Sequence, residues 1–403
     1  MKKNFLLLPG TIWQEKLMKE IKSQGHNLFV VNPTIDCPGY LYADGFLCED
    51  IFNKEKVTKF AINNKIDSIL SDECDIATTL IAELGKMLNI RTIDEKNAQL
   101  YTDKFQMREF SRKIGLNTPE YKLCYSVEEA KDFLHSLAHP IIIKPTDSNA
   151  SHGVFICKSE HDIEDKFAIA FEFSRNNKAV LCERYIEGKE FTIDGIKLPS
   201  GHYSLSISEK DHFSHNVNIA NELLFSHRND NYDYELLKSI NDKFVNSSTL
   251  EFGLTHAEYK FENGEFYMIE IGARGGGNNI SSIITPFMSG IDLYKLMIDY
   301  SLGKNLENRY LSIDKKFFNR CAILKFFSTP NKGGTVREII GEHLLRDNKY
   351  IRDYRFNFKI GDALKHAEND SKRIGYYIAC APSREVLNEI VAEIEEKVII
   401  VIE

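Results

Sequence analysis

The chain has 403 residues, 43% of them hydrophobic and 27% charged, which is enough apolar mass for the cores of two or three globular domains. The formal net charge of −8 and the lack of a broad Lys/Arg-rich stretch exclude nucleic acid as an expected partner, because polyanion binders usually present a basic face. The uninterrupted apolar run at Phe5–Leu8 is too short for a signal sequence or a membrane span. We therefore predict a cytoplasmic protein with no membrane partner, in which the eight scattered cysteines are free thiols.

Strand and helix signals alternate in the first 100 residues. The expected elements are a strand at Phe5–Leu8, a helix from Ile12 to about Ser23, strands at Leu28–Val31 and Ile66–Leu70, and a helix at Ile76–Leu88. Alternation of this kind predicts a parallel, Rossmann-like sheet. The dinucleotide-binding pattern G-x-G-x-x-G does not follow the first strand, so the sequence gives no reason to predict NAD.

The centre and the C-terminal part show a different pattern, with short β-rich runs between turns. The expected strands are Pro140–Pro145, Val180–Tyr185, Phe191–Ile196, Ala322–Phe327 and Tyr376–Cys380, with a turn at Asn331–Gly334 and a charged helix at Arg384–Lys397. These runs predict a mostly antiparallel α+β body after the α/β beginning. The pattern leaves open whether the part beyond about residue 305 is a separate domain or a lid.

A lysine at the end of an apolar run precedes a loop of small hydroxyl residues. Lys144 ends the run Ile-Ile-Ile-Lys-Pro, and the loop from Thr146 to Gly153 follows it. Such a loop offers backbone N–H groups and hydroxyls to phosphate oxygens, and the ammonium supplies a point charge. The alternative interpretation is a strand-end lysine followed by an ordinary polar surface loop.

Two acids flank a glycine-containing turn in the segment Leu181–Asp194. Glu183 lies in an apolar run, and Glu190 precedes the next one. A hinge of this kind can present main-chain groups to an adenine edge while a carboxylate accepts hydrogen bonds from ribose hydroxyls. The alternative is a hairpin with charged turn residues.

A third segment predicts a β-hairpin with acids on both strands, joined by a loop that contains Asn-Gly. Glu258 and Glu270 have the spacing to lie on matching faces of the two strands. Two neighbouring carboxylates repel each other unless a cation lies between them, and Mg²⁺ that binds with nucleotide phosphates uses one or two such groups. Arg274 and three glycines follow directly and suit the close approach of an anionic ligand. The alternative is a surface hairpin with solvent-facing acids.

In this order and spacing, the three segments resemble the ATP-grasp superfamily, in its carboxylate–amine (amino-acid) ligase branch. The segment Tyr101–Phe110 is similar to the entry helix of that family, which carries the first ATP lysine, and the segments Cys321–Phe327 and Pro330–Gly334 are similar to the terminal lid-completing part of the amino-acid ligases. The resemblance implies a Rossmann-like N-terminal domain at 1–100, an ATP-grasp domain at 101–304, and a segment at 305–403 that completes the ATP-grasp body or lid.

The resemblance also implies an ATP-dependent ligase that activates a small carboxylate as an acyl phosphate, joins it to an amine, and releases ADP and phosphate. The implied metal is one or two Mg²⁺ ions, with Mn²⁺ as an alternative, and homodimers are common in the superfamily. The implied roles are phosphate binding by Lys104, Lys144 and the loop with Ser151 and Gly153, adenine and ribose binding by Glu183, the main chain of Arg184 and Ile186, and Glu190, metal binding by Glu258 and Glu270, and catalysis by Lys144 and by Arg274 at the transferred phosphoryl group.

The sequence departs from the family pattern at two places and leaves other questions open. Gly272 occupies a position where the family often has an asparagine, for which Asn278 or Asn279 is the alternative, and Ala150 replaces a common glycine. His256 either faces the pocket or is a structural histidine. The competing functions are a biotin-carboxylase-like ligase, a purine-biosynthesis ligase, and an ATP-binding regulator without catalysis. The retained lysines, acids and arginine argue against the regulator, and the lack of a Met-Lys-Met signal argues against a self-contained carboxylase.

Overall fold

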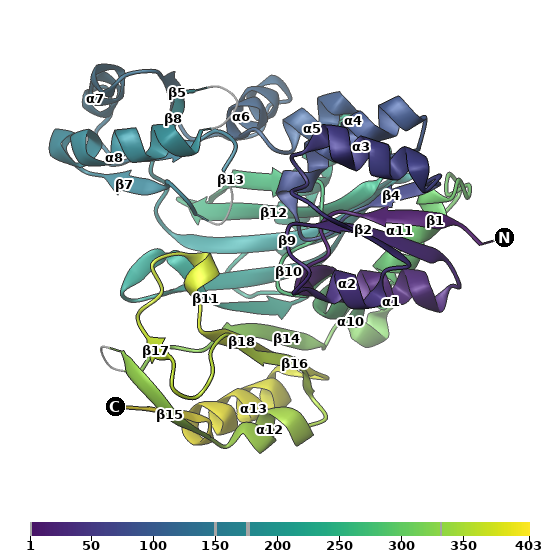
Figure 1. Cartoon of the computed structure of the whole chain (residues 1–403). Coiled ribbons are helices and arrows are strands. Elements are labelled where there is room, and N and C mark those ends of the chain that lie inside the picture. Colours follow the sequence, from purple (N-terminus) through teal and green to yellow (C-terminus); the bar gives the residue numbers. More distant parts are fainter. Residues whose placement is uncertain (1, 149–150, 175–177, 331–332) are drawn as a thin grey trace.

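The computed structural model describes residues 2–148, 151–174, 178–330 and 333–403 and begins with a parallel sheet (Figure 1). Its strand order is β3-β2-β1-β4, and the amphipathic helices bury their apolar faces against it. The elements are β1 (Asn4–Leu7), α1 (Glu15–Ser23), β2 (Asn27–Asn32), α2 (Pro38–Tyr42), β3 (Gly45–Cys48), α3 (Lys54–Asn63), β4 (Ser68–Leu70) and α4 (Thr78–Leu88). The predicted Rossmann-like sheet is confirmed, while the edge strand β3 was not predicted because none of its residues is fully buried.

A small antiparallel sheet with two helices forms the lid, at the upper left of Figure 1. Its strand order is β5-β8-β6-β7, and α7 and α8 share an apolar core with it. The elements from the linker onward are α5 (Glu95–Leu100), α6 (Lys104–Lys113), β5 (Tyr121–Cys124), α7 (Val127–His135), β6 (Ile141–Pro145), β7 (Phe155–Cys157), α8 (Glu160–Phe173) and β8 (Val180–Arg184). Helix α6 carries a predicted phosphate lysine, and β6 carries the other.

A large antiparallel sheet forms the body, with the order β13-β12-β9-β10-β11-β14-β18-β16. Its first part comprises β9 (Lys189–Leu198), β10 (Gly201–Phe213), β11 (Asn216–Ser226), α9 (Tyr234–Ser247), β12 (Gly253–Glu262) and β13 (Glu265–Gly272). A π-helical turn (Ile280–Ile284), α10 (Thr285–Ser289) and α11 (Leu293–Ser301) follow the hairpin. Together with the parallel sheet, this body confirms the predicted mixture of α/β and α+β structure.

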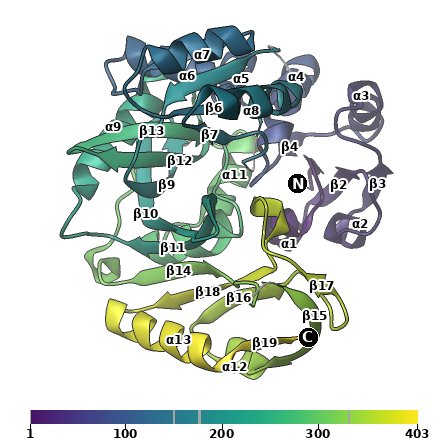
Figure 2. The ribbon, with the colours of Figure 1, turned by 90° about the vertical axis from the view of Figure 1, so that its left-hand side faces the viewer.

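The C-terminal part continues the same sheet, because β14 pairs with β11 and β18 pairs with β14. It comprises β14 (Cys321–Phe326), β15 (Gly334–Ile340), α12 (Glu342–Asp347), β16 (Ile351–Phe356), β17 (Ala363–Leu364), β18 (Gly375–Ala381), α13 (Arg384–Lys397) and β19 (Ile399–Ile402). Two residues of the turn expected at 331–334 lie outside the described residues. Figures 1 and 2 both show the segment between β17 and β18 rising from this part to the central sheet.

Candidate active site

A cavity of about 280 Å³ lies where the parallel sheet, the central sheet and the C-terminal part meet. It brings together charged side chains that are far apart in the sequence. Those that line it are Glu73 and Asp75 after β4, Lys210 on β10, Glu258 and Glu270 on the hairpin β12–β13, Arg274 after it, and Asp370 and Arg373 before β18. The predicted metal carboxylates and the predicted catalytic arginine therefore share one cavity.

The two acids of the hairpin lie directly opposite each other, since Glu258 pairs with Glu270 in the register of β12 and β13. Each carboxylate also has a lysine partner. Lys210 Nζ lies 3.0 Å from Glu258 Oε1, and Lys104 Nζ lies 3.0 Å from Glu270 Oε1. Burial alone would raise the pKa of Glu258, but the charge of Lys210 outweighs it, so this pKa lies below its ordinary value. Glu258 is thus held in the ionised form that a metal ligand requires.

Arg274 is fixed by a bidentate ion pair with Asp75, at 2.8 Å from Nε and 2.9 Å from Nη2. Burial alone would lower the pKa of Arg274, but Asp75 holds it above its ordinary value, so the guanidinium stays charged. The same pair explains Gly272. A Cβ atom at this position would lie 2.9 Å from the Asp75 carboxylate, so an asparagine could not stand here without displacing the partner of Arg274.

The predicted phosphate lysines have different surroundings. Lys104, the first residue of α6, donates from Nζ to the carbonyl oxygen of Ser148 at 2.7 Å, which connects the phosphate loop to the metal carboxylates. Lys144 on β6 is buried, and its Nζ lies 2.6 Å from Glu183 Oε2. Burial lowers the pKa of Lys144 to about 8, although Glu183 opposes this shift.

Glu183 is shared between Lys144 and Arg108, whose Nε lies 2.6 Å from Glu183 Oε1. Arg108 also donates to the carbonyl oxygen of Ile269 at 2.7 Å, next to the metal acid of β13. Arg108 was not predicted as a site residue. The sequence signal that could have identified it is its position four residues after Lys104, which puts both side chains on one face of α6. The carboxylate of Glu183 therefore already forms ion pairs with two cationic side chains of the protein.

The phosphate loop approaches the C-terminal part. Ser151 has a left-handed backbone (φ 59°), and its hydroxyl donates to Asp370 Oδ2 at 3.0 Å. Gly153 is also left-handed (φ 73°), and a Cβ there would lie 3.0 Å from Phe173 and Pro145. Ala150, the other departure from the family pattern, lies outside the described residues. Two of the predicted loop positions thus adopt a backbone that favours tight turns.

The predicted adenine segment joins β8 to β9. The N–H of Arg184 donates to the carbonyl oxygen of Glu120 at 2.8 Å, so this group is already used within the protein. The carbonyl oxygen of Ile186 accepts from Lys260 Nζ at 3.2 Å. Glu190 is buried and lies 2.5 Å from Lys210 Nζ. Burial alone would raise the pKa of Glu190, but Lys210 holds it well below its ordinary value. The nucleotide-binding roles of this segment remain predictions.

His256 lies in the cavity, where its Nδ1 is 2.9 Å from Asp194 Oδ1. The carboxylate of Asp194 also accepts from the N–H of Gly276 at 3.0 Å, and thus orients the histidine against the glycine-rich turn. Asn279 donates from its side chain to Asp353 and Tyr376, which connects it to the C-terminal part. Asn278 lines the cavity. Of the two asparagines, Asn278 is the one whose place suits the missing family residue.

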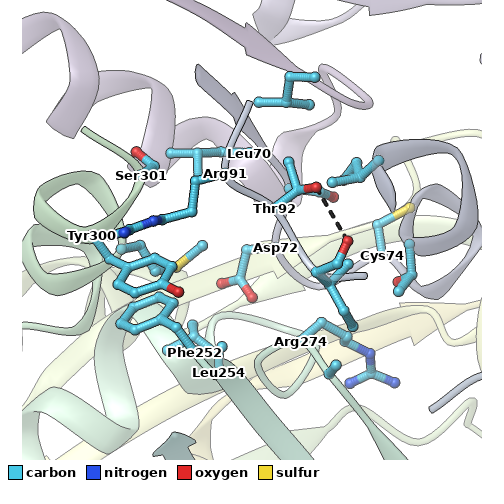
Figure 3. Close-up of a pocket in the computed structure, with 18 residues that line it drawn as sticks. Leu70, Asp72, Cys74, Arg91, Thr92, Phe252, Leu254, Arg274, Tyr300 and Ser301 are labelled. Carbon is cyan, nitrogen blue, oxygen red and sulfur yellow. Dashed lines mark hydrogen bonds between the residues drawn. The ribbon is translucent and has the colours of Figure 1, made fainter. Parts of the chain in front are cut away.

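A second cavity, of about 90 Å³, also borders Arg274 and is shown in Figure 3. Its wall is mostly apolar, with Leu70, Phe252 and Leu254 among its residues, and the Arg91 guanidinium lies over the Tyr300 ring at 4.7 Å from the ring centre. It contains neither of the paired acids of the hairpin. We therefore place the candidate chemistry in the first cavity.

Asp75 belongs to the loop Asp72–Asp75, which the sequence indicates as a substrate contact, because it follows a strand of the parallel sheet and side chains at carboxyl ends often meet a ligand. Three other residues of the site were not found from the sequence. Lys210 lies on the strand next to β9, and Asp370 and Arg373 come from a loop almost 100 residues after the hairpin. Their positions depend on strand pairing and packing that periodicity does not reveal.

Residues 137–282 match the family model of the ATP-grasp domain. The chain contains an ATP-grasp domain. Residues 326–403 match a second model, the L-amino acid ligase C-terminal domain 2. Both matches agree with the resemblance found in the sequence, including its amino-acid ligase branch.

Curated relatives and solved structures agree with these matches. Dapdiamide A synthase of Enterobacter agglomerans is 27% identical over 48% of this chain, and the alignment spans 47% of the relative, about half of its length. An L-arginine-specific L-amino acid ligase of Bacillus subtilis is 22% identical over 75% of this chain and 72% of the relative. The crystal structure of an L-amino acid ligase from Bacillus licheniformis has a TM-score of 0.83 at 18% identity, covering 100% of this chain and 99% of that one, and shows the shared fold. None of the helices in the described part of the chain combines the length and apolar character that a membrane span needs.

Proposed function

We propose that this protein is an ATP-dependent carboxylate–amine ligase that activates a small carboxylate as an acyl phosphate and releases ADP and phosphate. The observation that supports this proposal most directly is the cavity in which Glu258 and Glu270 face each other beside Arg274. Two fixed acids and a fixed arginine are what phosphoryl transfer requires, because its transition state is stabilised mainly by positioned charge.

The residues of the two carboxylates fit a divalent cation. Two carboxylates that face each other repel unless positive charge lies nearby, and Lys210 and Lys104 supply that charge here. Mg²⁺ would be held by Glu258 and Glu270 together with nucleotide phosphates, and it would neutralise phosphate charge. The number of ions, Mn²⁺ as an alternative, and a homodimeric assembly belong to this proposal. Metal titration and light scattering would test them.

The chain's own residues have separate tasks in this proposal. Lys104 and Lys144 hold the phosphates, and Ser151 and Gly153 shape the loop over them. Arg274, held by Asp75, neutralises the transferred phosphoryl group and the acyl phosphate. His256, oriented by Asp194, is placed in the same cavity to accept a proton from the attacking amine.

The match at residues 326–403 favours the amino-acid ligase branch over the carboxylase and purine alternatives. Two of the similar proteins, from Bacillus subtilis and Bacillus licheniformis, are L-amino acid ligases by name, which supports an amino acid as one substrate.

The test is ADP release from MgATP with a panel of amino acids and other small carboxylates, each with candidate amines, followed by mass spectrometry of the products. Hydroxylamine added with the accepted acid should trap a hydroxamate while ADP accumulates. Arg274→Ala should suppress both signals together. AMP as the nucleotide product would overturn the proposed mechanism, and a protein that binds ATP without turnover on any pair would overturn the enzymatic function.

A further inference from the structure

Arg373, in the loop before β18, is a second arginine in the active-site cavity. Its side chain is only 12% exposed, and its guanidinium carbon lies 3.7 Å from the centre of the Phe326 ring. One end of the guanidinium forms an ion pair with Asp370. The C-terminal part therefore contributes a buried positive charge that the proposed ATP chemistry does not use.

The donors of this guanidinium are incompletely used. Among the residues that the structure describes, Arg373 Nε has no hydrogen-bond acceptor, although it is buried. A buried N–H without an acceptor is unfavourable by about 1 to 3 kcal/mol, and more for a charged group, so such donors usually face a ligand position. Asp370 pairs with Nη2 through Oδ1 and accepts from Ser151 through Oδ2, and neither of its oxygens accepts from Nε.

The wall next to Arg373 is apolar. The side chains that form it are Ala220 and Leu223 on β11 and Leu324 and Phe326 on β14, all buried and all lining the cavity. Leu223 and Leu324 are directly paired across the two strands. A triphosphate would lose hydration against this wall without compensation, whereas a small organic acid could bury its apolar part there.

We infer that Arg373 binds the carboxylate of a small substrate whose apolar side chain packs on β11 and β14, and so determines specificity. This inference rests on the proposed function and adds to it a residue and a substrate class. A planar guanidinium with an unused Nε–H can form a two-point hydrogen bond with a carboxylate. Asp370 holds Arg373 in place from one side and connects it to Ser151 of the phosphate loop.

The experiment measures binding by calorimetry with the full chain saturated with Mg²⁺ and the non-hydrolysable analogue AMP-PNP. The probes are L-leucine, L-methionine and L-phenylalanine, each compared with the amino alcohol that lacks the carboxylate. The wild type should prefer at least one amino acid over its alcohol by about 100-fold, and Arg373→Met should reduce this preference by about 30-fold, since a charge-assisted two-point bond is lost. The affinity for AMP-PNP should stay within about twofold.

Arg337→Met, at an exposed arginine of the same C-terminal part, is the matched control and should behave as the wild type. Arg373→Lys should keep part of the preference, because the charge remains while the planar fork is lost. If Arg373→Met does not fold, Arg373→Gln takes its place. An equal loss of AMP-PNP affinity, an unchanged preference, or a wild type without preference for the carboxylate would overturn the inference. Ligase turnover is measured separately, so Arg373-dependent binding without ADP release would refute the proposed function and leave the inference standing.

Discussion

Two groups of ion pairs in this protein contain similar residues but differ in burial. Around Glu183, the partners Lys144 and Arg108 are both buried, and the carboxylate itself is 2% exposed. Around Glu258 and Glu270, side-chain exposures are 29% and 31%, and both acids line the cavity. The first group lies between the lid, α6 and β13, while the second group faces the place of the proposed chemistry.

The difference indicates which charges can change partner. A buried acid that loses one of its cations leaves an uncompensated charge in a medium that solvates it poorly. A cavity-lining acid can exchange its lysine for a metal ion with little rearrangement, because water and ligand reach it. We therefore expect Glu183 and Arg108 to act mainly on stability and position, and Glu258 and Glu270 to act mainly on turnover.

The largest expected effect is at the cavity-lining acids Glu258 and Glu270. Glu270→Gln should reduce the rate of ADP formation at least about 1000-fold, because several kcal/mol of charge stabilisation by the metal are lost. The fold should remain, as judged by an unchanged thermal unfolding midpoint. Glu265→Gln, at the exposed turn end of the same strand, is the control. Activity close to the wild type at saturating Mg²⁺ would contradict the metal assignment.

At the buried group, Arg108→Met should lower the free energy of unfolding by about 3 kcal/mol, because Glu183 keeps only one cation and the Ile269 carbonyl loses a donor. Urea unfolding measures this change. Arg112→Met, one turn later on the exposed face of α6, should have little effect. Equal free energies of unfolding for the two variants would show that the buried ion pairs stabilise the protein no more than an exposed ion pair does.

Lys144 belongs to the buried ion pairs around Glu183 but has a predicted role at the phosphates. A variant of Lys144 therefore tests whether a buried residue can act on substrate binding more than on stability. Lys144→Ala should raise the apparent KM for ATP by about 30-fold, since a charge on the phosphates is lost, while stability changes less than in Arg108→Met. Glu183 still has Arg108 as a partner in this variant. Lower stability with a normal KM for ATP would assign Lys144 a structural role alone.

The smallest expected effect is a pH dependence from the same lysine. Because the pKa of Lys144 is lowered to about 8, its ammonium loses its charge as pH rises through that value, and the apparent KM for ATP should then increase. Rising pH has the opposite effect on stability, which it increases through this group. In the unfolded chain Lys144 has its ordinary pKa of 10.5 and binds more protons than in the folded protein between about pH 8 and 10.5, so stability from this group rises with pH in that window. Lys144→Arg should give a flat KM profile up to pH 9; a wild-type profile equally flat would remove Lys144 from the phosphate site.

The fold was predictable where a local pattern decides it. Alternating apolar strands and helices fixed the parallel sheet, and the helix at Arg384–Lys397 has the bounds that its charge pattern predicted. The register of the hairpin turn alone would pair Glu258 with Ile269, and a β-bulge between Glu258 and Tyr259 places Glu258 opposite Glu270 instead. The edge strand β3 was missed because its side chains are only half-buried and give no clear alternation.

The site was predictable only within each segment. The hairpin acids and Arg274 are close in sequence, and so their proximity follows from local geometry. Asp370 and Arg373 reach the same cavity through tertiary packing, which no spacing in the sequence encodes. The partners of Lys144 and Glu190 were not predicted for the same reason. Arg108 reaches Glu183 because helix α6 packs beside the lid, and Lys210 reaches Glu190 because β10 pairs with β9.

The hydrogen bond from Ser151 to Asp370 has a consequence for the synthesis of the chain. The cavity needs Asp75 from the first 100 residues and Asp370 and Arg373 from the last 35. Domains usually fold as they leave the ribosome, N-terminal part first. The parallel sheet and the lid can therefore form early, but the cavity stays open on one side until the final segment has been released. A ribosome-stalled or proteolysed chain that ends before Asp370 would hold the hairpin acids without Arg373 or its partner, and its site would be incomplete.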